Sequence, residues 1–146
     1  MKIHLNQIPA EGLSAEESLD ASAYDLDAEG VKITSPLEVS YQAFLEGEDL
    51  FVHLSLDCQM RLTCSRCLAP YESFLEKEID LNYPIGKARV IDLTDDIRQE
   101  IVLEYPMKRL CAEACKGICQ VCGQNLNEVE CNCENQAKSE KRKTQN

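Results

Sequence analysis

No stretch of this 146-residue chain is apolar for long. Residues 1–9 mix apolar and polar side chains and lack the apolar core of a signal peptide. No apolar run approaches the length of a transmembrane helix either. These absences argue against a secreted or membrane-spanning protein. They predict a cytoplasmic protein, whose thiols stay reduced.

Basic residues are scarce, with 15 Lys and Arg against 26 Asp and Glu and a net charge of −11. Residues 1–107 hold 8 basic and 21 acidic side chains, whereas residues 108–146 hold 7 and 5. An acidic body repels nucleic acid phosphates over its general surface. Work near RNA would therefore fall to the C-terminal third or to a basic protein partner. Lys108, Arg109 and Lys116 in that third either contact such a partner or RNA, or screen the charge of nearby thiolates.

Signatures of catalysis are also missing. The sequence shows no nucleophile beside a general base, no glycine-rich phosphate loop and no open three-ligand zinc site. His4 and His53 have no ligand spacing to a cysteine. We therefore expect a protein without enzymatic activity and without a small-molecule substrate.

Cysteine is what the chain has in excess, with nine residues. Two pairs have C-x2-C spacing, Cys64 with Cys67 and Cys119 with Cys122. Such a turn brings two thiolates together, and zinc takes four ligands of this kind at roughly 2.3 Å. In a reducing compartment dense cysteine pairs indicate metal rather than disulfides. The odd total fits eight ligands and one spare, which we expect to be Cys58, buried on the apolar face of a strand.

Eight thiols can form two structural zinc sites. The partition we favour joins Cys119, Cys122, Cys131 and Cys133 locally and ties Cys64 and Cys67 to Cys111 and Cys115 across the chain. A rival partition joins Cys64 and Cys67 to Cys119 and Cys122 and leaves the other four as partial or redox thiols. The weakest link is the pair Cys131 and Cys133, because one intervening residue makes a tighter chelate than the usual two to four.

The spacing Cys115-x3-Cys119-x2-Cys122 also matches the cluster ligands of radical-SAM enzymes. That chemistry needs a large β/α barrel, and this chain is too short for the roughly 200 or more residues of such a fold. The match is therefore interpreted as coincidental. An iron–sulfur cluster of another kind stays as a minor alternative.

Alternating apolar residues predict an antiparallel meander of three strands. Residues 50–62 alternate strictly, residues 37–45 do so before them and residues 71–81 do so more weakly after them. Residues 46–49 read as a hairpin turn, and the Cys64–Cys67 pair as the second turn. Residues 2–8 suit a further strand, and residues 14–29 read as an acidic loop.

A helix is expected to follow the meander and to cover one face of it. Asp92, Asp95 and Asp96 suit its start, Ile97, Ile101, Val102 and Tyr105 form its apolar side, and Pro106 ends it. The predicted class is α+β, with a sheet-and-helix domain over residues 1–107 that includes the turn at 64–67. A cysteine-rich zinc module is expected over 108–133, where apolar residues are too few for a core. A disordered tail is expected over 134–146.

Two runs resemble the YceD family, which comprises large ribosomal RNA subunit accumulation proteins. They are L-T-C-S-R-C-L-A-P at residues 62–70 and L-C-A-E-A-C-K-G-I-C-Q-V-C-G-Q-N-L-N at residues 110–127. Gln120 stands where proline is frequent and Ile118 where leucine is, and neither change removes a thiol. The resemblance implies a non-enzymatic ribosome biogenesis factor needed for accumulation of 23S rRNA.

The acidic body favours action through a large-subunit assembly intermediate or a basic ribosomal protein, with direct rRNA contact left open. The alternative function is a redox-sensing or zinc-storing module, in which oxidation of the dense thiols releases metal.

Overall fold

A computed structural model of the chain describes residues 1–133, and the predicted disordered tail lies outside the described residues. The chain packs as two compact units. The first consists of Met1–Arg61 and Glu72–Pro106, and the second of Leu62–Tyr71 and the segment that begins at Met107. No helix in the described part of the chain is long and apolar enough to cross a membrane.

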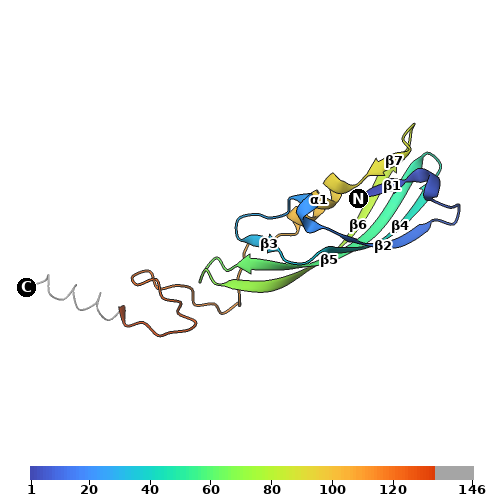
Figure 1. Cartoon of the computed structure of the whole chain (residues 1–146). Coiled ribbons are helices and arrows are strands. Elements are labelled where there is room, and N and C mark those ends of the chain that lie inside the picture. The colour runs from blue at the N-terminus through green and yellow to red at the C-terminus, as the bar shows by residue number, and fades with distance from the viewer. Residues whose placement is uncertain (134–146) are drawn as a thin grey trace, which may run out of the picture. The chain divides into compact units, whose positions relative to one another are not determined.

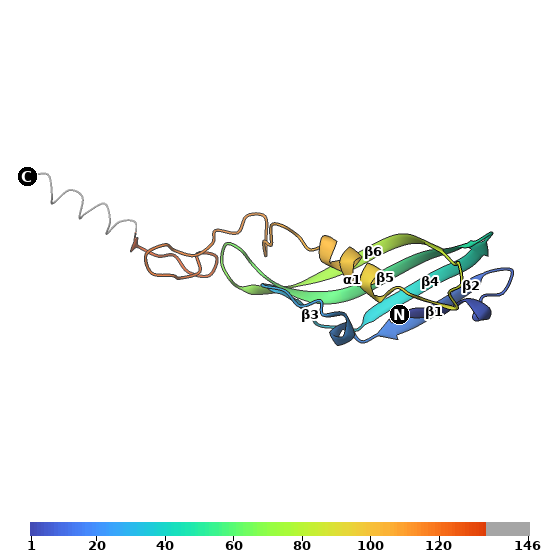
Figure 2. The same ribbon diagram turned by 90° about the horizontal axis from the view of Figure 1, so that it is seen from above.

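A five-stranded sheet forms the body of the first unit. Its members are β2 (Leu13–Leu19), β3 (Val31–Ile33), β4 (Leu37–Glu46), β5 (Asp49–Thr63) and β6 (Pro70–Pro84). They run in the order β2-β4-β5-β3, and β6 also pairs with β5. Figures 1 and 2 show β4, β5 and β6 as long neighbouring strands. The predicted meander is therefore the centre of a wider sheet.

The alternation in the sequence places one face of these strands in the core. Antiparallel pairing sets Tyr41 opposite Leu54 and Ala43 opposite Val52, and all four are buried. Glu46 pairs with Asp49, so a two-residue turn joins β4 to β5. Its first residue, Gly47, has a φ of 62°, which glycine adopts without a steric penalty.

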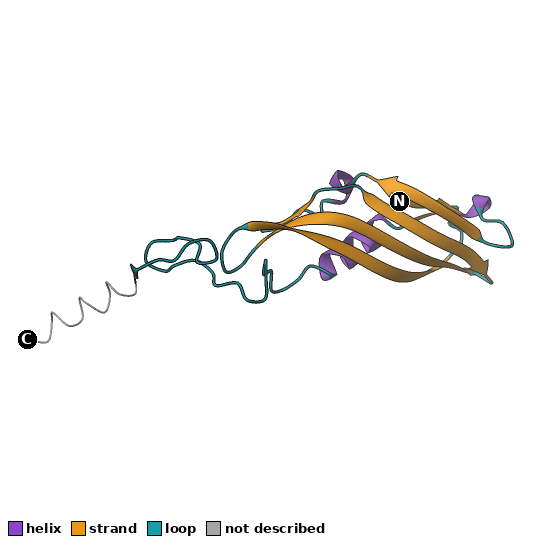
Figure 3. Cartoon of the chain, turned by 90° about the horizontal axis from the view of Figure 1, so that it is seen from below, coloured by secondary structure: helices purple, strands orange, loops and turns teal. Residues whose placement is uncertain are grey.

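Helix α1 (Thr94–Leu103) covers that core face of the sheet. It begins where the backbone N–H of Thr94 donates to Asp92 Oδ1 at 3.0 Å, and Ile97 and Ile101 are fully buried. Lys77 and Tyr83 of β6 contact Glu104 and Asp96, at the end and the start of the helix. Val102, which the sequence placed on the apolar side, is instead 41% exposed. In Figure 3 the strands lie in front of α1 and no helix crosses them.

The N-terminal third contains a shorter strand than the one predicted over residues 2–8, and it contains a strand where residues 14–29 were predicted to form a loop. β1 (Lys2–His4) pairs with β7 (Val90–Asp92), and a 3-10 turn over Leu5–Gln7 ends the strand that residues 2–8 suggested. The acidic loop expected at 14–29 is wrong, because β2 pairs with β4 from Leu13 to Leu19 and Ala21–Tyr24 forms a 3-10 helix. Within residues 1–133, antiparallel strands together with helix α1 confirm the α+β class.

Candidate metal centre

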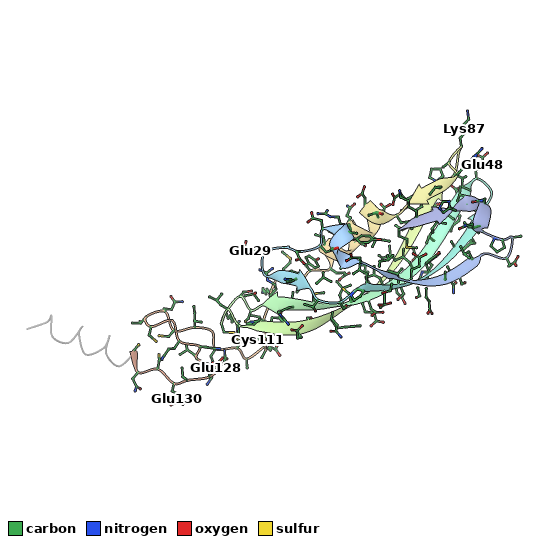
Figure 4. The ribbon with its side chains drawn as sticks, in the orientation of Figure 1. Glu29, Glu48, Lys87, Cys111, Glu128 and Glu130 are labelled. Atoms are coloured by element: carbon green, nitrogen blue, oxygen red, sulfur yellow. The ribbon has the colours of Figure 1, made fainter. Side chains whose placement is uncertain are left out.

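The first group of thiols combines two distant parts of the chain. Cys64 and Cys67 lie in the turn between β5 and β6, and Cys111 and Cys115 lie in the segment that follows α1. Their four sulfur atoms all lie within 4.8 Å of one another. The Cys64 and Cys115 sulfurs are 3.8 Å apart, and those of Cys67 and Cys111 are 3.6 Å apart. We call this group the first cluster (Figure 4, where Cys111 is labelled).

These separations test whether the residues suit a metal ion. A disulfide holds its sulfurs about 2.05 Å apart, and all nine cysteines are free. Four sulfurs placed tetrahedrally around zinc at roughly 2.3 Å lie about 3.8 Å from one another. The Cys64–Cys115 and Cys67–Cys111 separations match this spacing and the remaining sulfurs lie within 4.8 Å, so the donor set fits a four-coordinate thiolate metal. Cys64, Cys67 and Cys115 are buried, whereas Cys111 is exposed.

Local backbone geometry makes the turn that carries Cys64 and Cys67. The N–H of Leu68 donates to the carbonyl of Cys64 at 3.0 Å, and Leu68 has a φ of 60°, which is uncommon for a residue other than glycine. Gly117 closes on this turn, because a Cβ there would lie 3.2 Å from the carbonyl oxygen of Arg66. Arg66 in turn donates to the carbonyl of Cys115 at 3.1 Å. The turn and the later segment therefore fit closely.

The thiol pKa values of the first cluster diverge. Burial acts to raise the pKa of Cys64, but backbone N–H groups of Cys67, Cys111 and Arg66 outweigh it and lower that pKa to about 6. Hydrogen bonds with Cys67 and Cys115 raise the pKa of Cys111 to about 12. Removing a proton from each of four adjacent thiols accumulates negative charge, which a bound cation would offset.

The second cluster is local in sequence. The sulfurs of Cys119, Cys122, Cys131 and Cys133 lie within 4.8 Å of one another. A tight hairpin forms around its first pair, because the N–H of Cys119 donates to the carbonyl of Gln124 at 2.8 Å. Here only Cys119 is buried, Cys131 and Cys133 are half-buried and Cys122 is exposed.

The pKa values of the second cluster also separate. Backbone N–H groups of Cys122 and Val121 lower the pKa of Cys119 to about 6. Hydrogen bonding to Cys122, with burial and the Cys122 charge, raises the pKa of Cys133 to about 12. Cys119 therefore loses its proton more readily than Cys133, and a bound cation would favour deprotonation of both.

The structure thus brings together the eight cysteines proposed as ligands, in two sets of four. Cys64 and Cys67 meet Cys111 and Cys115, and Cys119 and Cys122 meet Cys131 and Cys133. That these thiols ligate a metal stays a prediction. Cys58 lies apart, 1% exposed, and burial raises its pKa to about 11, which suits a core residue.

The basic residues near the first cluster differ in accessibility. Lys108 and Lys116 are exposed, as a surface contact requires. Arg109 is half-buried, and its Nε is buried without a hydrogen-bond partner in the described part of the chain. Its backbone carbonyl accepts from both the N–H and the hydroxyl of Ser65. Arg109 is thus placed partly inside the unit, and Lys108 and Lys116 are better suited to meet a partner.

One residue of the site escaped the sequence analysis. The side-chain amide of Asn127 donates to the sulfur of Cys115 at 3.3 Å. Burial acts to raise the pKa of Cys115, but this bond and the Gly117 N–H outweigh it and lower the pKa. The only sequence signal was the position of Asn127 four residues after Gly123, within the run that resembles the YceD family.

Fold and clusters together define a class: a small α+β protein whose cysteine-rich unit has the geometry to hold two metal ions. The family model described as "Large ribosomal RNA subunit accumulation protein YceD" matches residues 72–143. The resemblance to the YceD family is thereby confirmed over a segment that contains most of β6, α1 and six of the eight clustered cysteines.

A curated relative agrees with this family. The chain is 37% identical over 62 residues to "Large ribosomal RNA subunit accumulation protein YCED homolog 1, chloroplastic" of Arabidopsis thaliana. The match covers 42% of this chain and 19% of the relative, so the chain spans only about a fifth of that protein. No solved structure matches the chain.

Proposed function

We propose that the chain is a non-enzymatic, cytoplasmic ribosome biogenesis factor that supports accumulation of large-subunit 23S rRNA. The observation that carries this proposal is the YceD family match over residues 72–143. In this proposal two zinc ions staple the cysteine-rich unit. A zinc ion with four thiolates keeps no open coordination position, which suits a structural rather than a catalytic role.

The solvent-facing side of the sheet supports a basic partner. Its carboxylates come from the four neighbouring strands β2, β4, β5 and β6: Glu16, Glu38, Glu46, Asp49, Asp57, Glu72, Glu76, Glu78 and Asp80. We call this set the acidic face. The basic side chains on the same side of these strands are Arg61 and His53, which pair with Glu72 at 2.8 Å and Asp80 at 2.7 Å. The remaining carboxylates are left for an external cation.

The centre of the acidic face carries an uncompensated pair of like charges. Glu38 and Asp57 are directly opposite each other on β4 and β5, and neither forms an ion pair with another described residue. Together with Glu16 they border a hollow of about 250 Å³. Like charges opposite each other destabilise a sheet. A lysine or arginine of a partner bound here would reduce the repulsion between the two carboxylates. Toward the other end of β4, on the same side of the sheet, exposed Phe44 stacks on Phe51 with ring centroids 5.3 Å apart and offers apolar contact.

Charge reversal separates binding from folding. Asp57→Lys places a cation opposite Glu38 and should stabilise the sheet by about 0.2–1 kcal/mol. The same variant should bind purified basic large-subunit proteins more weakly and more slowly, because steering by the acidic face is reduced. Binding is measured by surface plasmon resonance at two salt concentrations, and stability by urea unfolding.

Glu29→Lys is the matched control, since Glu29 is exposed but lies outside the acidic face (Figure 4). Equal loss of binding in both variants would mean that net charge alone matters. Unchanged binding in Asp57→Lys would remove the acidic face from the proposal.

Deleting the gene should lower 23S rRNA and large-subunit particles, and the wild-type chain should restore both. Cys111→Ala, which opens the first cluster, should fail to restore them, whereas Cys58→Ala should succeed because Cys58 lies outside both clusters. Northern blots and sucrose gradients give the readout. Unchanged rRNA after deletion would overturn the proposed function.

The redox alternative is favoured by one observation, the exposure of Cys122 in the second cluster. It would gain if native mass spectrometry showed metal loss after mild peroxide while rRNA stayed normal without the gene.

A further inference from the structure

Asn127 joins the two cysteine clusters. In sequence it lies between Cys122 and Cys131, both of the second cluster. In space its side-chain nitrogen is 3.3 Å from the sulfur of Cys115, which belongs to the first cluster. A residue held by one cluster thus contacts a ligand candidate of the other.

Three hydrogen bonds orient the Asn127 amide. Its Nδ2 donates to Cys115 Sγ at 3.3 Å and to Asn125 Oδ1 at 2.8 Å, and its Oδ1 accepts from the backbone N–H of Lys116 at 2.8 Å. The reversed orientation would set an oxygen against a sulfur anion and another oxygen, and would leave the Lys116 N–H facing a donor. The N–H of Asn127 must therefore point at the sulfur.

The hairpin of the second cluster positions Asn127. Ile118 bridges to Asn125, and the N–H of Leu126 donates to the carbonyl of Gly117 at 2.9 Å. Cys119 and Cys122 lie at the tip of this hairpin, so a metal that binds them closes the loop from which Asn127 extends.

Apolar packing contributes little to holding the same loop. Val121 is 74% exposed and Val129 is 44% exposed. Ile118 and Leu126 are half-buried, and none of the large apolar residues described in this loop is fully buried. Without metal at the second cluster, the hairpin therefore has few interactions that would keep Asn127 against Cys115.

We propose that the two clusters bind metal cooperatively, and that Asn127 is the positioning residue that couples them. Zinc at the second cluster fixes Asn127, whose N–H stabilises the Cys115 thiolate and raises the affinity of the first cluster for zinc. Outer partners of metal ligands commonly change metal affinity roughly 10–100-fold. The coupling is reciprocal, as linkage requires. This inference rests on the proposed metal binding.

Asn127→Asp tests the donor alone. Aspartate keeps an oxygen that accepts from Lys116 N–H, but it replaces the N–H that faces Cys115 with an acceptor. We expect the full-length, zinc-loaded variant to release zinc from the first cluster at a chelator concentration roughly 10–100-fold lower than wild type. Thiol alkylation followed by peptide mass spectrometry reports each cluster separately.

Asn132→Asp is the matched control, because it makes the same chemical change at an exposed asparagine beside the second cluster. It should leave the first cluster unchanged. Cys122→Ser, which opens the second cluster, should weaken the first by the same factor as Asn127→Asp, and the double variant should lose no more. In reverse, Cys67→Ser should weaken the second cluster.

Cadmium NMR of the wild type and Asn127→Asp distinguishes a hydrogen bond from Asn127 to the Cys115 sulfur from a purely structural role of Asn127 in the loop. Loss of the N–H···S bond should shift one cadmium resonance and leave the other in place. Zinc bound to both clusters with unchanged release in Asn127→Asp would overturn the coupling and spare the proposed function. A wild-type chain that binds no zinc would overturn both.

Discussion

Removing metal should unfold the cysteine-rich unit and leave the sheet and α1 folded. The buried cluster of this unit consists of Cys64, Cys67 and Cys115, with Ala69, Tyr71, Leu110 and Ile118 only partly buried around them. Among the described residues, Leu62 at the end of β5 is the one large apolar side chain that is fully buried in this unit. Met107 is 99% exposed and adds nothing. Structural zinc contributes roughly 10–16 kcal/mol of apparent binding free energy in small finger peptides, far more than so small a core can supply. The first unit instead has its own core, in which Leu54, Ile97 and Ile101 are fully buried.

Hydrogen exchange with mass spectrometry measures this outcome on the full chain before and after chelation. Protection should vanish in peptides from residues 107–133 and from the turn at 64–67, and it should persist in β4, β5 and α1. Global unfolding on chelation would show that the first unit depends on metal, and unchanged protection throughout would show that metal does not hold the second.

Leu54→Ala should destabilise the sheet and leave the cysteine-rich unit unchanged, the reverse of the effect expected from metal removal. The side chain is 0% exposed at the centre of the sheet, opposite Tyr41. Truncating a buried leucine to alanine costs about 2–5 kcal/mol, because packing is lost and a cavity remains. Urea unfolding followed by far-ultraviolet circular dichroism should therefore show a lower midpoint, while metal content per folded chain stays at the wild-type value.

Ser55→Ala is the neighbouring control, since Ser55 points to the solvent side of the same strand and its loss should be nearly neutral. A Leu54→Ala chain as stable as wild type would mean that the sheet core tolerates the cavity. Loss of metal at equal fractions of folded chain would mean that the two units do not respond independently.

Alternation of apolar residues predicted the centre of the sheet because one face of β5 is buried in the core and the other faces solvent. Leu50 to Leu62 are buried at every second position, and the sequence shows this directly. β2 was missed because Leu13, Ala15 and Leu19 are only half-buried and Glu17 stands among them. Its strand conformation comes from pairing with β4, which a single sequence does not display. The three-residue strands β1 and β7 depend on each other in the same way.

The grouping of thiols proposed from spacing agrees with the positions of the sulfurs, because short C-x2-C turns fix their own geometry. The contacts of Asn127 and Arg66 could not be inferred. The Arg66 guanidinium reaches a carbonyl 49 residues away in the chain, and Asn127 meets a sulfur 12 residues away. Both contacts arise only after the loop around Gly117 has closed on the turn.

The first cluster also sets an order of events during synthesis. Cys67 and Cys111 are 44 residues apart, so at about 5–20 residues per second the ribosome makes Cys111 roughly 2–9 s after Cys67. In that interval the nascent chain carries two thiols without their partners while the strands up to β6 and then α1 are completed. The sheet can thus form before the second pair of thiols exists. Under the proposed function, metal capture would then be the closing step of maturation rather than its beginning.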